Sequence, residues 1–137
     1  MTAQYQPLTR HERSKHSAPV LIAFVEVCAD WLLEQEEELA AAGSPNAEEY
    51  TDWCLSAINE ERLVLPERLL VRMNSVVGID LALRKLLPRV EDRIHWLRHP
   101  SNGPLCRGRT PISIITEAEE FHLVELREGV DEWMDTI

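Results

Sequence analysis

Apolar residues recur at steps of three and four along most of the chain, which is the period of amphipathic α-helices. The clearest stretch runs from Pro66 to Leu87, and its apolar residues cover so wide an arc that we expect a central helix surrounded by others. Pro88 ends this helix, and a short helix is predicted from Val90 to Arg98. No stretch has the alternating pattern of a strand, so the pattern predicts an all-α protein.

The first half of the chain predicts two helices. Ser17-Ala18-Pro19 has the order of a cap followed by a first-turn proline, and apolar residues continue at helical spacing to about residue 42, where Gly43 marks the end. Ser44-Pro45 opens a second helix that ends near Asn59. Residues 1–16 are polar and carry no apolar period, which is typical of a mobile arm.

Four glutamates (Glu34, Glu36, Glu37 and Glu38) fall late in the expected helix 17–42. The helix dipole disfavours anions at that end, so tertiary packing must hold the last turns.

The C-terminal part predicts two more helices. Thr110 and Pro111 have the cap-then-proline order, with Gly108 before them for a special backbone angle or a close approach. Thr116-Glu117-Ala118-Glu119 fits the capping box of a last helix. We therefore expect a single bundle of about five to six helices with three parts: the arm 1–16, acidic helices over 17–61, and a C-terminal domain over 62–137.

The net charge of −10 is unevenly distributed. Residues 16–61 hold eleven acidic side chains and no Lys or Arg, whereas residues 62–115 hold ten basic and four acidic side chains. An acidic first half is a poor surface for a polyanion, because binding phosphates requires Lys or Arg. Two interpretations stay open: solvated acidic helix faces, which are the commoner case, or an acidic surface that faces a basic partner.

Motifs for catalysis, cofactors or metals do not emerge, and we expect no enzyme. The chain lacks a Gly-rich phosphate loop, a nucleophile elbow and zinc-type cysteine spacing. His95 and His99 are four residues apart, but no further ligands lie at a telling distance, so a surface role is the better interpretation. Three widely spaced cysteines, no signal peptide and no apolar run long enough for a membrane span predict a soluble cytoplasmic protein.

One combination of residues is specific enough to suggest a family. His95-Trp96-Leu97-Arg98 is followed by His99-Pro100 and then by Gly108-Arg109-Thr110-Pro111-Ile112, after a long apolar helix. This pattern over about residues 62–130 resembles the toxin-binding domain of the MbcA/ParS/Xre antitoxin family. The usual N-terminal helix-turn-helix of that family would be degenerate or replaced here, because the corresponding region is acidic.

The resemblance implies an antitoxin of a type II toxin-antitoxin system. Such proteins bind an NAD-consuming RES-domain toxin, and their C-terminal segment blocks its active site. The residues expected at the partner are Arg107, Arg109, Pro111, Glu125, Glu128, Gly129, Val130 and Trp133. An aromatic residue near the chain end can anchor a partner, although packing of the last helix is an equal alternative for Trp133.

Two other functions remain open at this point. The chain could be a transcriptional regulator that binds DNA through a remodelled helix-turn-helix, or an orphan protein-interaction module of the same fold. We expect no cofactor, no membrane contact and no specific DNA binding, and we take a homodimer as the default assembly for such a bundle.

Overall fold

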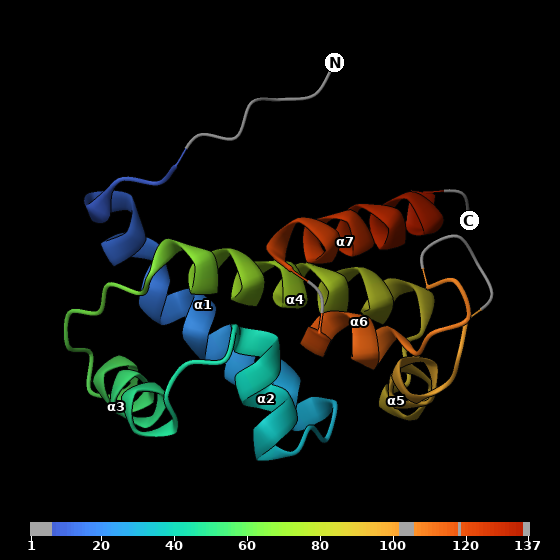
Figure 1. Ribbon diagram of the computed structural model, residues 1–137, viewed down its shortest axis with the longest axis horizontal. Helices are drawn as coiled ribbons and strands as arrows, with labels where there is room; N and C mark the ends of the chain where they lie inside the picture. Colours follow the sequence, from blue (N-terminus) through green and yellow to red (C-terminus); the bar gives the residue numbers. More distant parts are fainter. Residues whose placement is uncertain (1–6, 102–105, 118, 136–137) are drawn as a thin grey trace.

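The computed structural model describes residues 7–101, 106–117 and 119–135, and these form seven helices and no strand (Figure 1). The helices are α1 (Arg10–Asp30), α2 (Gln35–Ala42), α3 (Ala47–Ile58), α4 (Glu67–Leu86), α5 (Val90–Arg98), α6 (Pro111–Glu117) and α7 (Glu120–Asp135). The all-α prediction is confirmed, with one helix more than expected. No helix in the described part of the chain is long and apolar enough to cross a membrane.

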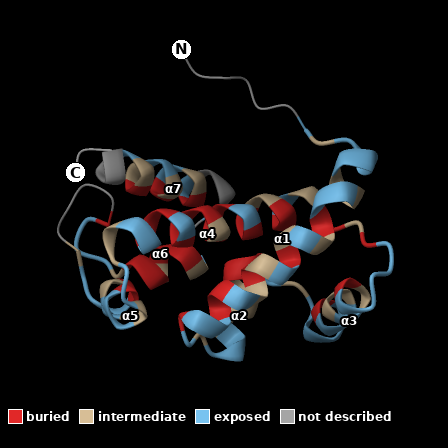
Figure 2. Ribbon diagram, turned by 180° about the vertical axis from the view of Figure 1, so that it is seen from behind, coloured by how far each residue is buried: buried red, intermediate tan, exposed pale blue. Residues whose placement is uncertain are grey.

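Helix α4 lies at the centre of the bundle, as the wide apolar arc of its sequence predicts. It packs against α1 and α7 over most of its length, and against α2 and α5 over shorter stretches. Its residues contribute much of the buried core, including Met73, Val76, Ile79 and Leu83, which are completely inaccessible to solvent (Figure 2). Leu65, just before α4, is equally buried. The same core cluster includes buried residues of α1, so it joins both halves of the chain.

Helix α1 begins earlier than the sequence pattern predicts. Thr9 caps it: the Thr9 hydroxyl accepts from the Glu12 backbone N–H at 3.1 Å, and the Glu12 carboxylate accepts from the Thr9 N–H at 3.0 Å. The arm 1–16 is therefore partly helical, and Pro19 lies inside α1. Ser17 is not a cap; its buried hydroxyl donates to the Arg13 carbonyl at 2.6 Å and accepts from the Leu65 N–H at 2.9 Å.

The prediction of one helix over residues 17–42 is wrong, because the chain turns between α1 and α2. Leu32 adopts a positive φ of 57° in this turn. Glu34 then caps α2, and the following glutamates occupy its first turn. Anions are favourable at a helix N-terminus, so the break turns an unfavourable placement of these charges into a favourable one.

Two other helix starts differ from the prediction. Asn46 caps α3, its side chain accepting from the N–H groups of Glu48 and Glu49, so the helix begins slightly after Ser44-Pro45. Thr116 belongs to α6, where its hydroxyl donates to the Ile112 carbonyl at 2.9 Å. It therefore does not form the capping box expected for the last helix.

Candidate partner-binding surface

The turn between α5 and α6 is closed by main-chain hydrogen bonds between its two ends. The Ser101 N–H donates to the Arg109 carbonyl at 3.1 Å, and the Gly108 N–H donates to the Ser101 carbonyl at 2.7 Å. Gly108 has a φ of 84°, which side chains rarely allow, and this explains the glycine before the cap. Cys106 is buried under the turn, and burial raises the pKa of its thiol despite the opposing influence of Ser101 and Arg109.

Thr110 caps α6 as the sequence predicts. Its hydroxyl accepts from the Ser113 N–H at 3.2 Å, and the Ser113 hydroxyl donates back to the Thr110 carbonyl at 2.7 Å. Pro111 is the first helical residue, and it is buried together with Ile112. The side chain of Pro111 therefore packs in the core and offers no surface to a partner.

The two arginines of the turn are exposed but differ in their contacts. The backbone of Arg107 adopts a positive φ of 49°, and its side chain is exposed to solvent. The Arg109 guanidinium forms an ion pair with the Glu117 carboxylate at the other end of α6, with the two side chains 50% and 66% exposed. Arg109 therefore connects the turn to the C-terminal end of α6, while about half of its side chain still faces solvent.

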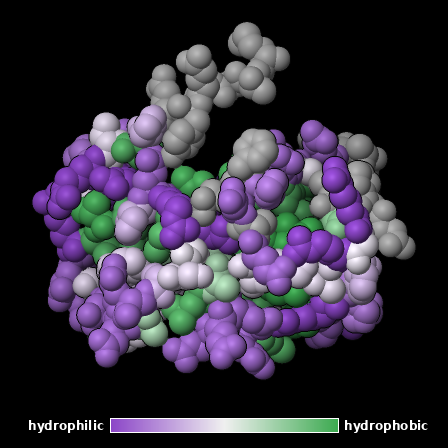
Figure 3. All heavy atoms as spheres, in the orientation of Figure 1, coloured by the Kyte–Doolittle hydropathy of each residue, from purple (hydrophilic) through white to green (hydrophobic). Residues whose placement is uncertain are grey.

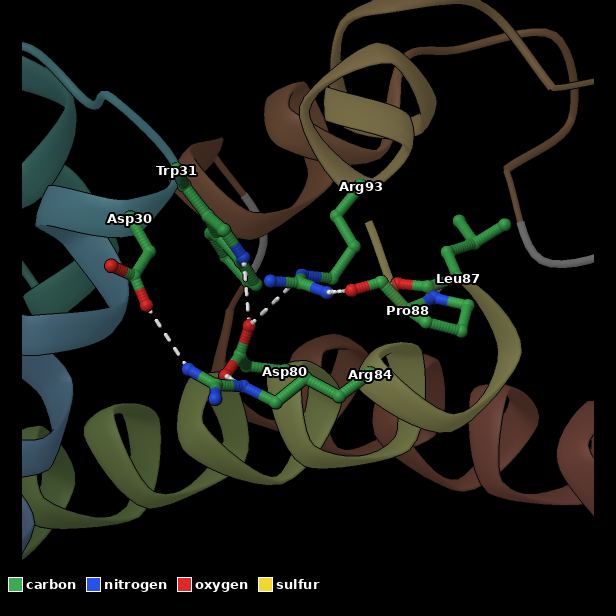
Figure 4. A network of polar contacts seen from close by, with 7 residues as sticks. All are labelled: Asp30, Trp31, Asp80, Arg84, Leu87, Pro88 and Arg93. Atoms are coloured by element: carbon green, nitrogen blue, oxygen red, sulfur yellow. Dashed lines mark hydrogen bonds and ion pairs between the residues drawn. The ribbon is translucent and has the colours of Figure 1, made fainter. Parts of the chain in front are cut away.

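Helix α5, on one side of the turn, is anchored by a buried arginine (Figure 4). The Arg93 guanidinium donates to the carbonyls of Leu87 and Pro88 at 2.8 and 3.0 Å, and its Nε lies 3.9 Å from the Asp80 carboxylate. Asp80 of α4 also accepts from the Trp31 indole at 3.0 Å and from Arg84 at 2.7 Å. One buried carboxylate thus connects α1, α4 and α5.

Helix α6, on the other side of the turn, is anchored by a second buried arginine. Arg72 of α4 donates to the Ile115 carbonyl of α6 at 2.8 Å and to the Ala41 carbonyl of α2 at 3.0 Å. Both carbonyls lie in the last turn of their helix, where no intrahelical donor is available. Arg72 therefore supplies C-terminal donors to two helices and fixes α6 on α4.

Helix α7 has one face in the core and one face toward solvent. Leu123, Leu126 and Val130 are buried, so Val130 supports the core and its side chain offers no surface to a partner. Glu125 and Glu128 are exposed, and Gly129 is half-buried. Trp133 lies in the last turns of α7, but its side chain falls outside the described part of the structure.

A close approach between α4 and α7 occurs at Gly78. The Arg127 side chain of α7 lies across this glycine, where an added Cβ would stand 2.2 Å from the Arg127 Nε. Its guanidinium also reaches the Asn74 carbonyl at 3.5 Å. The absence of a side chain at residue 78 is what lets Arg127 lie there.

The structure brings the expected site residues to one end of the bundle without joining them. The turn around Arg107 and Arg109 and the last turns of α7 both lie toward the end of the molecule where α4 finishes (Figure 1, Figure 2). Among the described residues, no hydrogen bond or ion pair connects either arginine to Glu125 or Glu128. A partner would therefore meet two separate patches, one basic and one acidic.

The anchoring residues Asp80, Arg93 and Arg72 were not among the expected site residues. A signal for them existed, since charged residues stand at apolar-face positions of α4 and α5. Their partners are main-chain carbonyls and a distant indole, and sequence spacing does not indicate such contacts.

Acidic side chains and two stacked histidines are exposed on α3 and at the end of α5. The exposed start of α3 carries Glu48, Glu49 and Asp52, which repel phosphates, and many arginines of α4 and α5 are buried or paired with carboxylates. His95 and His99 stack on each other with ring centroids 3.7 Å apart. No group of three His, Cys, Asp or Glu side chains in this part of the chain could hold a metal ion.

On the face shown in Figure 3, hydrophilic side chains predominate and apolar ones gather in separate patches.

Comparisons with known proteins found no match: no protein-family model, no curated protein and no solved structure matches the chain. The functional argument therefore depends on the residues and the geometry described above.

Proposed function

We propose that this protein is an antitoxin of the MbcA/ParS/Xre type that neutralises a RES-domain toxin by direct binding. The observation that carries the proposal is the division of α7 into a buried apolar face and an exposed acidic face, with an exposed Arg-containing turn toward the same end of the bundle (Figure 1). The order of a long helix, a short helix, a Gly-Arg-Thr-Pro turn and a final helix supports the same assignment.

The antitoxin would act by occlusion and would perform no chemistry itself. Glu125, Glu128 and Glu132 are exposed and lie three, four and seven residues apart, so they form one stripe along α7. A toxin that binds NAD needs cationic side chains for the phosphates, and carboxylates form strong charge-assisted hydrogen bonds with arginines. Acidic groups on α7 would compete for those cations and would also accelerate association.

The buried residues of α7 limit where the chain can be truncated without removing part of the core. Val130 is completely buried, so any truncation before it removes part of the core. A chain that ends after Asp131 keeps Leu123, Leu126 and Val130 and loses only the last residues. This truncation separates blocking of the toxin from stability of the bundle.

The test is co-expression with a RES-domain toxin, with growth and cellular NAD as readouts. We expect the truncation after Asp131 and the triple variant Glu125→Gln/Glu128→Gln/Glu132→Gln to lose neutralisation while the purified proteins remain helical by circular dichroism. The matched control, Glu48→Gln/Glu49→Gln/Asp52→Asn on α3, should neutralise normally. Full rescue by both α7 variants would reject α7 as the blocking element.

The regulator alternative has a separate test. If the arginines of α4 and α5 are held by internal partners, the protein should show no sequence-specific binding to duplex DNA at physiological salt. A specific gel shift at nanomolar protein, lost at higher salt, would favour the regulator over the antitoxin.

A further inference from the structure

An apolar cleft lies between α1 and α3, away from the turn and from α7. It has a volume of about 130 Å³ and is lined by Ile22, Val25 and Glu26 of α1 and by Cys54, Ala57 and Ile58 of α3. Large apolar side chains stand exposed around it: Ile22 is 42% exposed and Ile58 is 71% exposed. Since a dry cavity of about 150 Å³ can hold benzene, this cleft has room for one branched aliphatic side chain.

The surroundings of the cleft are acidic. Glu26 lines it directly, and exposed Glu60 and Glu61 follow the end of α3. Residues 16–61, which include all of α3 and the part of α1 from His16 to Asp30, contain eleven acids and no Lys or Arg, whereas the basic residues Arg10, Arg13 and Lys15 lie in the first turns of α1. An exposed apolar patch with an acidic rim is complementary to a segment that is apolar on one side and basic on the other.

Two other occupants fit less well. A second copy of this chain would form a two-fold contact in which each acidic rim faces the same rim of its partner, and like charges at an interface are repulsive. The segments of this chain outside the described residues (1–6, 102–105, 118 and 136–137) contain no Lys or Arg, so none of them matches the rim.

We propose that the α1–α3 cleft is a docking site for a basic amphipathic helix of a partner protein. One aliphatic side chain of that helix enters the cleft beside Ile22 and Ile58, and its Lys or Arg residues lie over Glu26, Glu60 and Glu61. Helix-in-groove recognition of this kind uses apolar anchors spaced one turn apart. The site lies on helices other than those of the proposed toxin-blocking surface, so neither proposal depends on the other.

The test uses a synthetic Leu/Lys peptide with leucines at positions i, i+3, i+4 and i+7, labelled for fluorescence anisotropy. We expect saturable one-to-one binding to the full chain, which weakens as salt is added. Ile58→Ser should lower the affinity about tenfold, because it removes the exposed wall of the cleft without opening the core. Ile22→Ser should act in the same direction, and Glu26→Gln should have a smaller effect.

Controls separate the cleft from general attraction between opposite charges. Leu81→Ser, which changes a 59% exposed leucine on α4, should leave the peptide affinity within about twofold. A Leu/Lys peptide of the same composition but without helical spacing should bind at least about tenfold more weakly. Thermal unfolding of each variant checks that the bundle is intact.

Three results would overturn the proposal. The peptide could fail to bind, or it could bind equally well to wild type and Ile58→Ser. Sedimentation could instead reveal concentration-dependent dimers that Ile58→Ser abolishes, which would assign the cleft to a second copy of this chain.

Discussion

The two halves of α4 hold their neighbours by opposite chemistry. In the first half, Arg68 and Arg72 donate to main-chain carbonyls at the C-terminal ends of other helices. In the second half, the Asp80 carboxylate accepts hydrogen bonds from Trp31 and Arg84 and lies beside Arg93. We call the contacts of Arg68 and Arg72 the first joint and the contacts of Asp80 the second joint. The first joint divides its hydrogen bonds between two arginines and three carbonyls, whereas the second depends on one carboxylate.

This difference has a consequence for stability. Loss of a single arginine from the first joint leaves neutral carbonyls without donors, which costs a limited free energy for each group. Loss of the carboxylate from the second joint leaves a cation buried beside an unpaired indole, which costs more. The joint around Asp80 should therefore be the more fragile of the two.

The largest effect is expected for Asp80→Ala. Removing this carboxylate leaves Arg93 without its counter-ion in a site where the arginine is 6% exposed, and we expect unfolding to become easier by about 3–5 kcal/mol. Urea unfolding monitored by circular dichroism measures the change. Asp92→Ala, which removes an exposed acid of α5, is the control and should change stability by no more than about 0.5 kcal/mol.

Asp80→Asn refines the test, because it keeps an oxygen acceptor for Trp31 and removes only the charge. A loss clearly smaller than that of Asp80→Ala would assign part of the stabilisation to the hydrogen bonds. A loss below about 1 kcal/mol for Asp80→Ala would contradict the central role of this carboxylate.

The next effect concerns the first joint. Arg72→Leu leaves the carbonyls of Ala41 and Ile115 without the arginine's hydrogen bonds, and at about 1–2 kcal/mol for each carbonyl we expect a loss of about 2–4 kcal/mol. Arg68→Leu is the matched variant: Arg68 is exposed and donates to the Gly43 carbonyl, so its loss should cost about 1 kcal/mol. Equal losses for the two variants would contradict the assignment of Arg72 as the main anchor of α2 and α6.

Between the two joints, α4 meets α7 at Gly78. Alanine in a helix is about 1 kcal/mol more favourable than glycine, but the new Cβ would displace the Arg127 side chain. We expect Gly78→Ala to be nearly neutral in the wild type and to stabilise the Arg127→Ala variant by about 1 kcal/mol. Thermal unfolding of the four proteins of this double-mutant cycle measures the coupling, and a stabilisation of the same size in both backgrounds would show that Arg127 does not oppose a side chain there.

Local sequence patterns predicted the central elements well, because their signals are local. The expected helices 66–87 and 90–98 match α4 and α5 within one residue at each end, and Thr110 caps α6. The break at residues 31–34 was missed because Trp31 and Leu32 continue the apolar period, although the glutamates after them already indicated a new helix start. The Thr9–Glu12 capping box was likewise present in the sequence.

The functional surface was less predictable, for a physical reason. Sequence spacing identifies exposed acids on α7 and arginines in the turn, but it does not reveal which arginine is held by a distant carbonyl or carboxylate. Val130 and Pro111 are buried, although each lies two residues from an exposed one, Glu128 and Arg109. Only the packing of α6 and α7 on α4 determines which of these residues are buried and which face solvent.

The smallest effect concerns an exposed pair that connects helices from both joints. Glu37 of α2 and Arg98 of α5 form a bidentate ion pair, with Nη2 and Oε1 2.8 Å apart. The Arg98 hydrogen bond lowers the pKa of the Glu37 carboxyl, so this pair stabilises the fold above the ordinary glutamate pKa of about 4.3. The contribution is lost as the pH falls through the lowered pKa, because the carboxyl then binds a proton in the folded state as well.

Glu37→Gln should therefore reduce stability at pH 7 by about 0.2–1 kcal/mol, and the difference from wild type should shrink below about pH 4. Urea unfolding at pH 7, 5 and 3 measures it, and Arg98→Gln should remove the same pH-dependent contribution. A difference that stays constant over this pH range would mean that the charge of Glu37 does not stabilise the fold. In that case the packing of α2 and α5 against α4 and α6, together with the two joints of α4, would hold these helices in place.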